Sequence, residues 1–113
     1  MKEGRRTAVV FNGDFHWFDA DPSWFDNVER RIAPYRAIRG NVETEISRSQ
    51  DIGAGCGCAY PATVADETVQ RSNQILRELR EVAQIYPDAC RCLPELPMHL
   101  VIDVGGLRVG IVH

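Results

Sequence analysis

Two short apolar segments with an amphipathic segment between them constrain the fold more than any other feature of the chain. Residues 7–11 form a continuous apolar and β-branched run bounded by turn residues, which is typical of a strand covered on both faces. Residues 35–38 predict a second short strand. Because the connections between the three segments are short, the economical arrangement is a right-handed parallel unit of strand, helix and strand. The sequence therefore predicts an α/β fold with parallel strands.

The segment between the two strands carries signals for both ends of a helix. Asp21 suits the N-cap, Pro22 suits the first helical position, and Pro34 ends the helix. Its apolar residues recur at helical spacing and are expected to form one buried face, made of Trp24, Phe25, Val28 and Ile32.

The second half of the chain predicts one long helix and a hairpin. Residues 42–61 are rich in glycine and are expected to be irregular. Thr63 and Asp66 resemble a capping box that opens a helix ending at Pro87. Its buried stripe is expected to contain Val69, Leu76, Leu79, Ala83 and Tyr86. The segments "HLVIDV" and "LRVGIVH" then predict a β-hairpin with Gly105 and Gly106 at its turn.

Size and charge limit the class of protein. The chain has 113 residues, which suits a single domain spanning 1–113. Its net charge is −3, and arginine and glutamate residues are mixed, so no basic surface for nucleic acid is expected. No apolar run is long enough to cross a membrane and no signal peptide is recognisable, so we expect a cytoplasmic protein without a membrane partner.

The four cysteines occur as two Cys-x-Cys pairs, Cys56 with Cys58 and Cys90 with Cys92. In a reducing compartment they are expected to be free thiols. A structural zinc site that uses all four is the alternative, although paired zinc ligands are usually separated by two or more residues.

Polar residues follow three of the predicted strands. Asp14 and Asn41 each come after a glycine at a strand end, and His113 follows the last strand. Ligands in open α/β sheets bind beyond the carboxyl ends of the strands. A carboxylate, an amide and an imidazole form a ligand set that suits Mn²⁺, Fe²⁺ or Zn²⁺. The sequence thus predicts a metal site at Asp14, Asn41 and His113, with ordinary turn chemistry as the alternative.

The segments "VVFNGD", "RAIRGNVETE" and "LRVGIVH" resemble the central motifs of the calcineurin-like metallophosphoesterases. The motifs of that family are D-x-H, G-D, G-N-H-D/E, a lone His and G-H-x-H, placed at strand ends of an αββα sandwich. The resemblance implies hydrolysis of phosphoric esters, either monoesters or diesters, with two divalent metals in complete family members. It also implies that Asp14 bridges the metals, and that Asn41 and His113 bind the second one.

The chain departs from the family pattern at several points. Val42 stands where the family usually has a catalytic His, and Glu43 matches the acidic residue that orients that His. His16 is a candidate substrate-facing residue, with packing among aromatic side chains as the alternative. No D-x-H precedes "VVFNGD" and no G-H-x-H follows His113, so we expect a truncated domain whose activity is incomplete without those ligands.

Two other functions remain open at this stage. The chain is alternatively a non-catalytic α/β interaction domain with a degenerate metal site, whose open sheet edges pair with a second copy or another partner. A four-cysteine zinc module is the third alternative.

Overall fold

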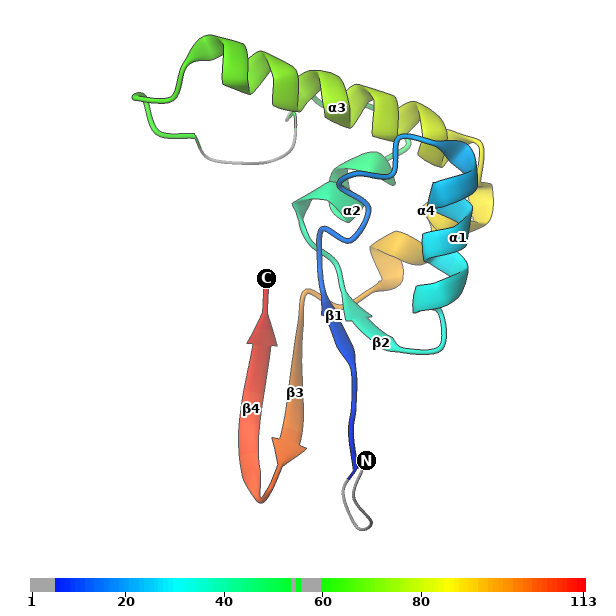
Figure 1. The fold of residues 1–113 in the computed structure, drawn as a ribbon, viewed down its shortest axis with the longest axis vertical. Helices are drawn as coiled ribbons and strands as arrows, with labels where there is room; N and C mark the ends of the chain where they lie inside the picture. The colour runs from blue at the N-terminus through cyan, green and yellow to red at the C-terminus, as the bar shows by residue number, and fades with distance from the viewer. Residues whose placement is uncertain (1–5, 54, 56–59) are drawn as a thin grey trace.

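The computed structural model describes residues 6–53, 55 and 60–113. Strands β1 (Val10–Asn12) and β2 (Arg36–Ile38) pair in parallel, and helix α1 (Pro22–Ile32) connects them (Figure 1). This confirms the predicted unit of strand, helix and strand, although β1 begins three positions later than residue 7. The parallel pairing places the carboxyl ends of both strands at the same edge of the sheet.

The predicted N-terminus of α1 is confirmed. The Asp21 carboxylate accepts hydrogen bonds from the backbone N–H groups of Ser23 at 2.9 Å and Trp24 at 3.2 Å. The predicted apolar face is only partly correct, because Phe25 is fully buried whereas the Trp24 side chain is 60% exposed. Neighbouring residues on a helix point about 100° apart, so Trp24 turns away from the side that packs on the rest of the molecule.

Helix α2 (Asn41–Ile46) lies in a segment that was predicted to be irregular, and that prediction was wrong there. Val42 and Ile46 are both buried. Their spacing of four residues is the helical signal, but it is too short to stand out beside the Gly40-Asn41 pair, which reads as a turn.

The long predicted helix is confirmed as α3 (Asp66–Gln84), with Ala65 rather than Thr63 at its N-cap. The helix was predicted to end at Pro87, and α3 ends at Gln84, shortly before it. Pro87 also begins a short helix, α4 (Pro87–Cys92), which the 3₁₀ turn η1 (Leu93–Glu95) follows. Proline suits a first helical position because it has no N–H to leave unpaired there.

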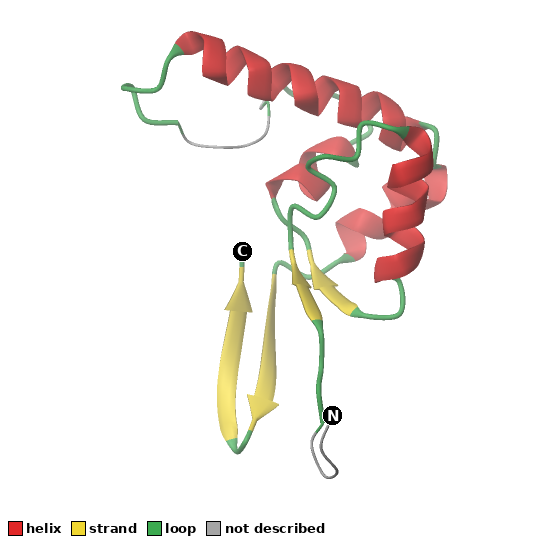
Figure 2. Cartoon of the chain, in the orientation of Figure 1, coloured by secondary structure: helices red, strands yellow, loops and turns green. Residues whose placement is uncertain are grey.

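The main core lies among the helices. Figure 2 shows the helices on one side of the molecule and the hairpin on the other. Phe25, from α1, and the side chains of α2 meet the inner face of α3 there. The buried members of this helical core are Phe25, Val42, Ile46, Leu76, Leu79, Val82, Ala83, Ala89 and Leu93. Of the stripe predicted for α3, Leu76, Leu79 and Ala83 belong to it.

The predicted C-terminal hairpin is confirmed as β3 (His99–Val104) and β4 (Leu107–Val112). Gly105 and Gly106 have φ values of 56° and 82°, which the two-residue turn requires. The hairpin forms a sheet separate from β1 and β2, and it projects away from the helices (Figure 1).

In the part of the chain that the structure describes, no helix has the length and apolar character needed to cross a membrane.

Candidate functional site

The ends of β1 and β2 approach each other closely because both carry glycine. Gly13 has a φ of 79°, and a Cβ atom on it would lie 2.6 Å from His113 Nδ1 and 2.7 Å from the backbone nitrogen of Gly40. A Cβ on Gly40 would collide with the Asp14 carboxylate. Only glycine therefore fits at these two positions, and their closeness brings Asp14 next to the start of α2.

Asp14 also occupies the left-handed region, with a φ of 55°. Aspartate tolerates this conformation better than most residues with a side chain. Its Oδ1 accepts a hydrogen bond from the backbone N–H of Val42 at 3.0 Å. Its Oδ2 lies 3.1 Å from Nε2 of His113. The structure thus brings two of the predicted ligands into direct contact.

His113 is held by its other ring nitrogen. Nδ1 lies 2.7 Å from the backbone carbonyl of Asn12, and because a carbonyl only accepts, Nδ1 is the donor. The hydrogen bond to Asn12 is the main cause that raises the pKa of His113, the charges of Asp14 and Glu43 add to it, and partial burial opposes it. Metal-binding histidines usually donate their second ring N–H to such an acceptor, which leaves Nε2 directed at the ion.

Asn41 is the first residue of α2 and lines a cavity of about 210 Å³ beside this contact. The cavity is bordered by the end of β2, by α2 and by the C-terminus of the chain; its lining residues are Arg39, Gly40, Asn41, Thr44, Glu45, Met98 and His113. All three predicted ligands are thus gathered at one edge, Asp14 and His113 in contact and Asn41 on the wall of the adjoining cavity.

The carboxylate, amide and imidazole of Asp14, Asn41 and His113 are donor types that suit Mn²⁺, Fe²⁺ or Zn²⁺. Asp14 offers a carboxylate, and its side chain is 33% exposed. His113 offers an imidazole, and its side chain is 30% exposed. Among the described residues, no group of three or more His, Cys, Asp or Glu side chains is arranged to hold a metal. Any cation site here therefore depends on the amide of Asn41 or on ligands from elsewhere.

Glu43 supports this edge from inside the protein and is fully buried. Its Oε1 accepts hydrogen bonds from the backbone N–H groups of Phe15 at 3.3 Å and Gly40 at 3.5 Å. Oε2 has no hydrogen-bond partner among the described residues. Burial first, and then the charge of Asp14, raise the pKa of this carboxyl. Glu43 thus joins the loop after β1 to the end of β2.

His16 does not face the cavity, in contrast to the substrate-facing expectation. Its side chain is fully buried and stacks on Phe25 with ring centroids 4.1 Å apart. Nδ1 lies 2.8 Å from an oxygen of Asp19, and Nε2 lies 2.6 Å from an oxygen of Glu29. Because both ring nitrogens are engaged, His16 has the packing role that was the alternative.

The structure describes two of the four cysteines that the alternative zinc site would use. Cys56 and Cys58 lie outside the described residues. Cys90 is half-buried in α4, its thiol donates to the carbonyl of Ala83 at 3.2 Å, and burial raises its pKa. Cys92 is exposed. Residues two apart on a helix point to nearly opposite sides, so Cys90 and Cys92 do not form a chelating pair in this conformation.

Sequence reasoning missed Arg39, which lines the same cavity as Asn41 and His113. The signal was a basic residue directly after a buried strand and before a glycine. An arginine is not a metal ligand, so a pattern of metal-binding residues at strand ends does not indicate it.

Comparisons of this chain with models of known protein families, with curated proteins and with solved structures gave no match.

Proposed function

We propose that Asp14, Asn41 and His113 bind a divalent cation for the hydrolysis of phosphoric esters. The cation would be Mn²⁺, Fe²⁺ or Zn²⁺, in line with the mixed oxygen and nitrogen donors. We further propose that the two sheets are part of a metallophosphoesterase-like αββα sandwich. These proposals extend the resemblance of the strand-end motifs.

One observation carries the proposal: Nε2 of His113 lies 3.1 Å from Oδ2 of Asp14, while Nδ1 is anchored on the carbonyl of Asn12. Asn12 and His113 are 101 positions apart, so this meeting requires the tertiary fold. The buried carboxyl of Glu43 lies next to this contact, and Gly13 and Gly40 allow the two strand ends to approach each other.

When bound, the cation polarises the phosphoryl group and activates the attacking water. The chain's own residues would hold the cation and orient the ester. Val42 stands where the family has a catalytic His, and it offers no proton to the leaving group. We therefore expect esters with good leaving groups, whose departure needs no acid, to be the best substrates.

We also propose that this activity is incomplete without further ligands. In the family pattern, D-x-H and G-H-x-H residues complete the dinuclear site, and the sequence given contains neither motif in the matching place. Another segment or another chain would have to supply them.

The test is calorimetric titration of the full chain with Mn²⁺ and Zn²⁺, followed by assays with p-nitrophenyl phosphate and bis(p-nitrophenyl) phosphate. We expect Asp14→Ala and His113→Ala to abolish metal binding. Asp103→Ala is the control, since it removes an exposed carboxylate from the hairpin. Unchanged affinity in Asp14→Ala would rule out this site, and a bound zinc that is lost only in Cys56→Ser would favour the cysteine module.

A second candidate function is supported by the hairpin. One of its faces consists entirely of aliphatic cross-strand pairs, here called the aliphatic hairpin face: Leu100 with Ile111, Ile102 with Val109, and Val104 with Leu107. Val104 is 52% exposed and Leu107 is 70% exposed. Contiguous exposed apolar surface of this kind marks interaction sites.

On this second reading the chain is a non-catalytic interaction domain that pairs through this face with a second copy. Sedimentation would then reveal an oligomer that is insensitive to chelators and dissociates in Leu107→Asp. Val112→Asp is the matched control on the opposite face of the hairpin. A monomer at all concentrations would exclude this reading.

A further inference from the structure

Arg39 lines the cavity beside His113, and its guanidinium has no ion-pair partner among the residues that the structure describes. It directly follows β2. Its guanidinium makes one weak side-chain hydrogen bond, in which Nη1 lies 3.4 Å from Oγ1 of Thr44. Its Nε is buried without a hydrogen-bond partner in the described part of the chain. Buried donors are normally satisfied, so the hydrogen-bonding capacity of this arginine is only partly used among the described residues.

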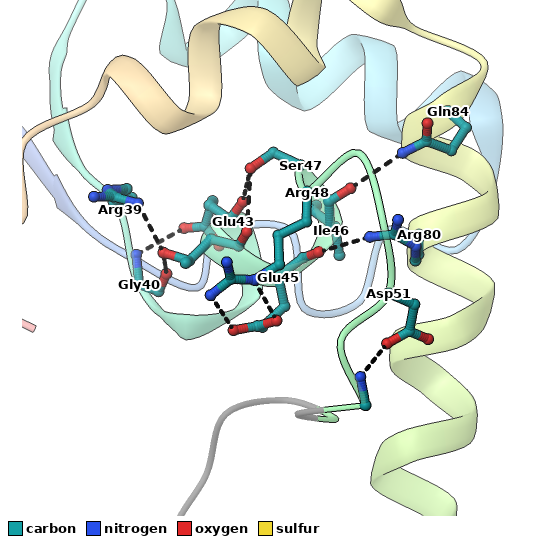
Figure 3. A network of polar contacts seen from close by, with 12 residues as sticks. Arg39, Gly40, Glu43, Glu45, Ile46, Ser47, Arg48, Asp51, Arg80 and Gln84 are labelled. Carbon is teal, nitrogen blue, oxygen red and sulfur yellow. Dashed lines mark hydrogen bonds and ion pairs between the residues drawn. The ribbon is translucent and has the colours of Figure 1, made fainter.

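The acidic residue in the same wall does not fill this role. Glu45 is held by Arg48, whose Nε and Nη2 lie 2.8 Å and 3.1 Å from its two oxygens (Figure 3). This two-point pairing offsets the charge of Glu45. Asp14 is likewise engaged by Val42 and His113. The positive charge of Arg39 therefore remains available to a ligand.

The size of the cavity indicates the size of that ligand. Its volume of about 210 Å³ is below the range of roughly 300–1,000 Å³ for drug-sized ligands. A small polyatomic group such as the phosphoryl end of an ester fits within this volume. Thr44 places a hydroxyl in the same wall, and this hydroxyl donates to the carbonyl of Gly40 at 2.9 Å. A planar guanidinium with several donors matches two oxygens of a tetrahedral oxyanion.

We propose that Arg39 binds the phosphoryl oxyanion of the ester and so positions it beside Asp14, Asn41 and His113. This inference rests on the proposed function, because it gives that site its anion-binding half. Arg39 is a substrate-binding residue in this arrangement, while Asp14, Asn41 and His113 would hold the cation.

The test uses inorganic phosphate as the probe, titrated into the metal-free full chain by calorimetry, with Mn²⁺ titrated separately. We expect Arg39→Gln to weaken phosphate binding about tenfold or more, as the loss of charged hydrogen bonds requires. Arg39→Lys keeps the charge but loses the two-point geometry, so we expect an intermediate affinity. Arg31→Gln is the matched control, since it removes an exposed arginine from α1, outside the cavity.

The outcomes separate this inference from the proposed function. Equal phosphate affinity in Arg39→Gln and the unchanged protein would overturn the role of Arg39, whatever the Mn²⁺ result, and so would a failure of the unchanged protein to bind phosphate. Parallel losses of Mn²⁺ and phosphate binding in Arg39→Gln would also overturn it, because they would indicate a general disturbance of the edge. Phosphate binding that depends on Arg39, without any Mn²⁺ binding, would support the anion site and rule out the proposed metal-dependent hydrolysis.

Discussion

The helical part of the molecule and the β3–β4 hairpin differ in how their apolar side chains are buried. In the helical core, Leu79 and Ile46 are fully buried, whereas Leu107 and Val104 of the hairpin are more than half exposed. A two-stranded hairpin is at best marginally stable alone in water. The comparison shows that the candidate site joins a well-packed region to a weakly packed one, since Asp14 is hydrogen-bonded to the buried Val42 of α2 and His113 follows β4.

Specific contacts rather than a core attach the hairpin to the rest of the molecule. The backbone N–H of Arg39 donates to the carbonyl of Pro97, just before β3, at 3.0 Å. His113, after β4, lies at this same open end of the hairpin and contacts Asn12 and Asp14. The geometry of the site therefore depends on polar contacts that hold the open end of the hairpin.

The largest effect is expected in the helical core. Leu79→Ala removes a fully buried side chain and should lower the free energy of unfolding by about 2–5 kcal/mol. Leu107→Ala, at a side chain that is 70% exposed, should change it by less than about 0.5 kcal/mol. Urea unfolding followed by circular dichroism measures both. Equal losses would mean that the hairpin is as well packed as the helices, and the comparison would fail.

The next largest effect is expected at Gly13. In Gly13→Ala, the new Cβ would meet His113 and Gly40 at a φ of 79°, which should cost about 1–3 kcal/mol and displace His113. Gly110→Ala is the control, since a Cβ there meets nothing within 4 Å. NMR signals of the His113 ring, read together with urea unfolding, test this. If the ring signals do not move in Gly13→Ala, the two strand ends are farther apart than described.

Glu43 tests whether the site edge is supported from inside. Glu43→Ala leaves the N–H groups of Phe15 and Gly40 without their acceptor and should cost about 1–3 kcal/mol. Glu43→Gln keeps an oxygen in place and should cost less, because burial already raises the pKa of this carboxyl and disfavours its charge. Thermal unfolding of both variants measures the difference. Identical losses would show that the charge, not the acceptor oxygen, is what matters.

A smaller and local effect is expected for His113→Gln. The loss of its contacts to Asn12 and Asp14 should speed hydrogen exchange in β3 and β4 while exchange in α3 stays unchanged, with a change of about 1 kcal/mol or less. His99→Gln, at an exposed position of β3, serves as the control. Unchanged exchange in the hairpin would mean that its attachment does not depend on His113.

The smallest effect is expected from lowering the pH, which protonates Asp21 at the N-cap of α1. Hydrogen bonding, first by the Ser23 hydroxyl and then by the backbone of Trp24, lowers the pKa of Asp21 below its usual 3.8. The stabilisation is therefore present above the usual carboxyl pKa and is lost as the pH falls through the lowered value. Asp21→Asn keeps an acceptor but removes this pH dependence, which acid titration of the helical signal detects. A titration that is the same in both proteins would contradict the capping role.

Local signals predicted most of the fold. The N-cap at Asp21, the proline at position 22 and the paired glycines of the hairpin turn each act within a few residues, and the structure contains all three features. α2 and α4 were missed because helices of 6 residues carry too little periodicity to compete with neighbouring glycine and proline signals.

The candidate site was predictable only as a set of strand ends. The order of the motifs indicated Asp14, Asn41 and His113, and the structure gathers them at one edge. The sequence left two roles open for His16, and it placed Arg39 beside a strand end without showing that it lines the cavity, because both outcomes depend on how distant elements pack.

By itself, the sequence determined the parallel pair joined by a helix, the long helix and the hairpin, because capping, glycine conformation and apolar spacing act over short distances. Only the tertiary structure decided that His113 meets a carbonyl 101 positions earlier, and that one aliphatic face of the hairpin stays outside the helical core. Such contacts depend on how whole elements pack against each other, and local spacing does not encode that packing.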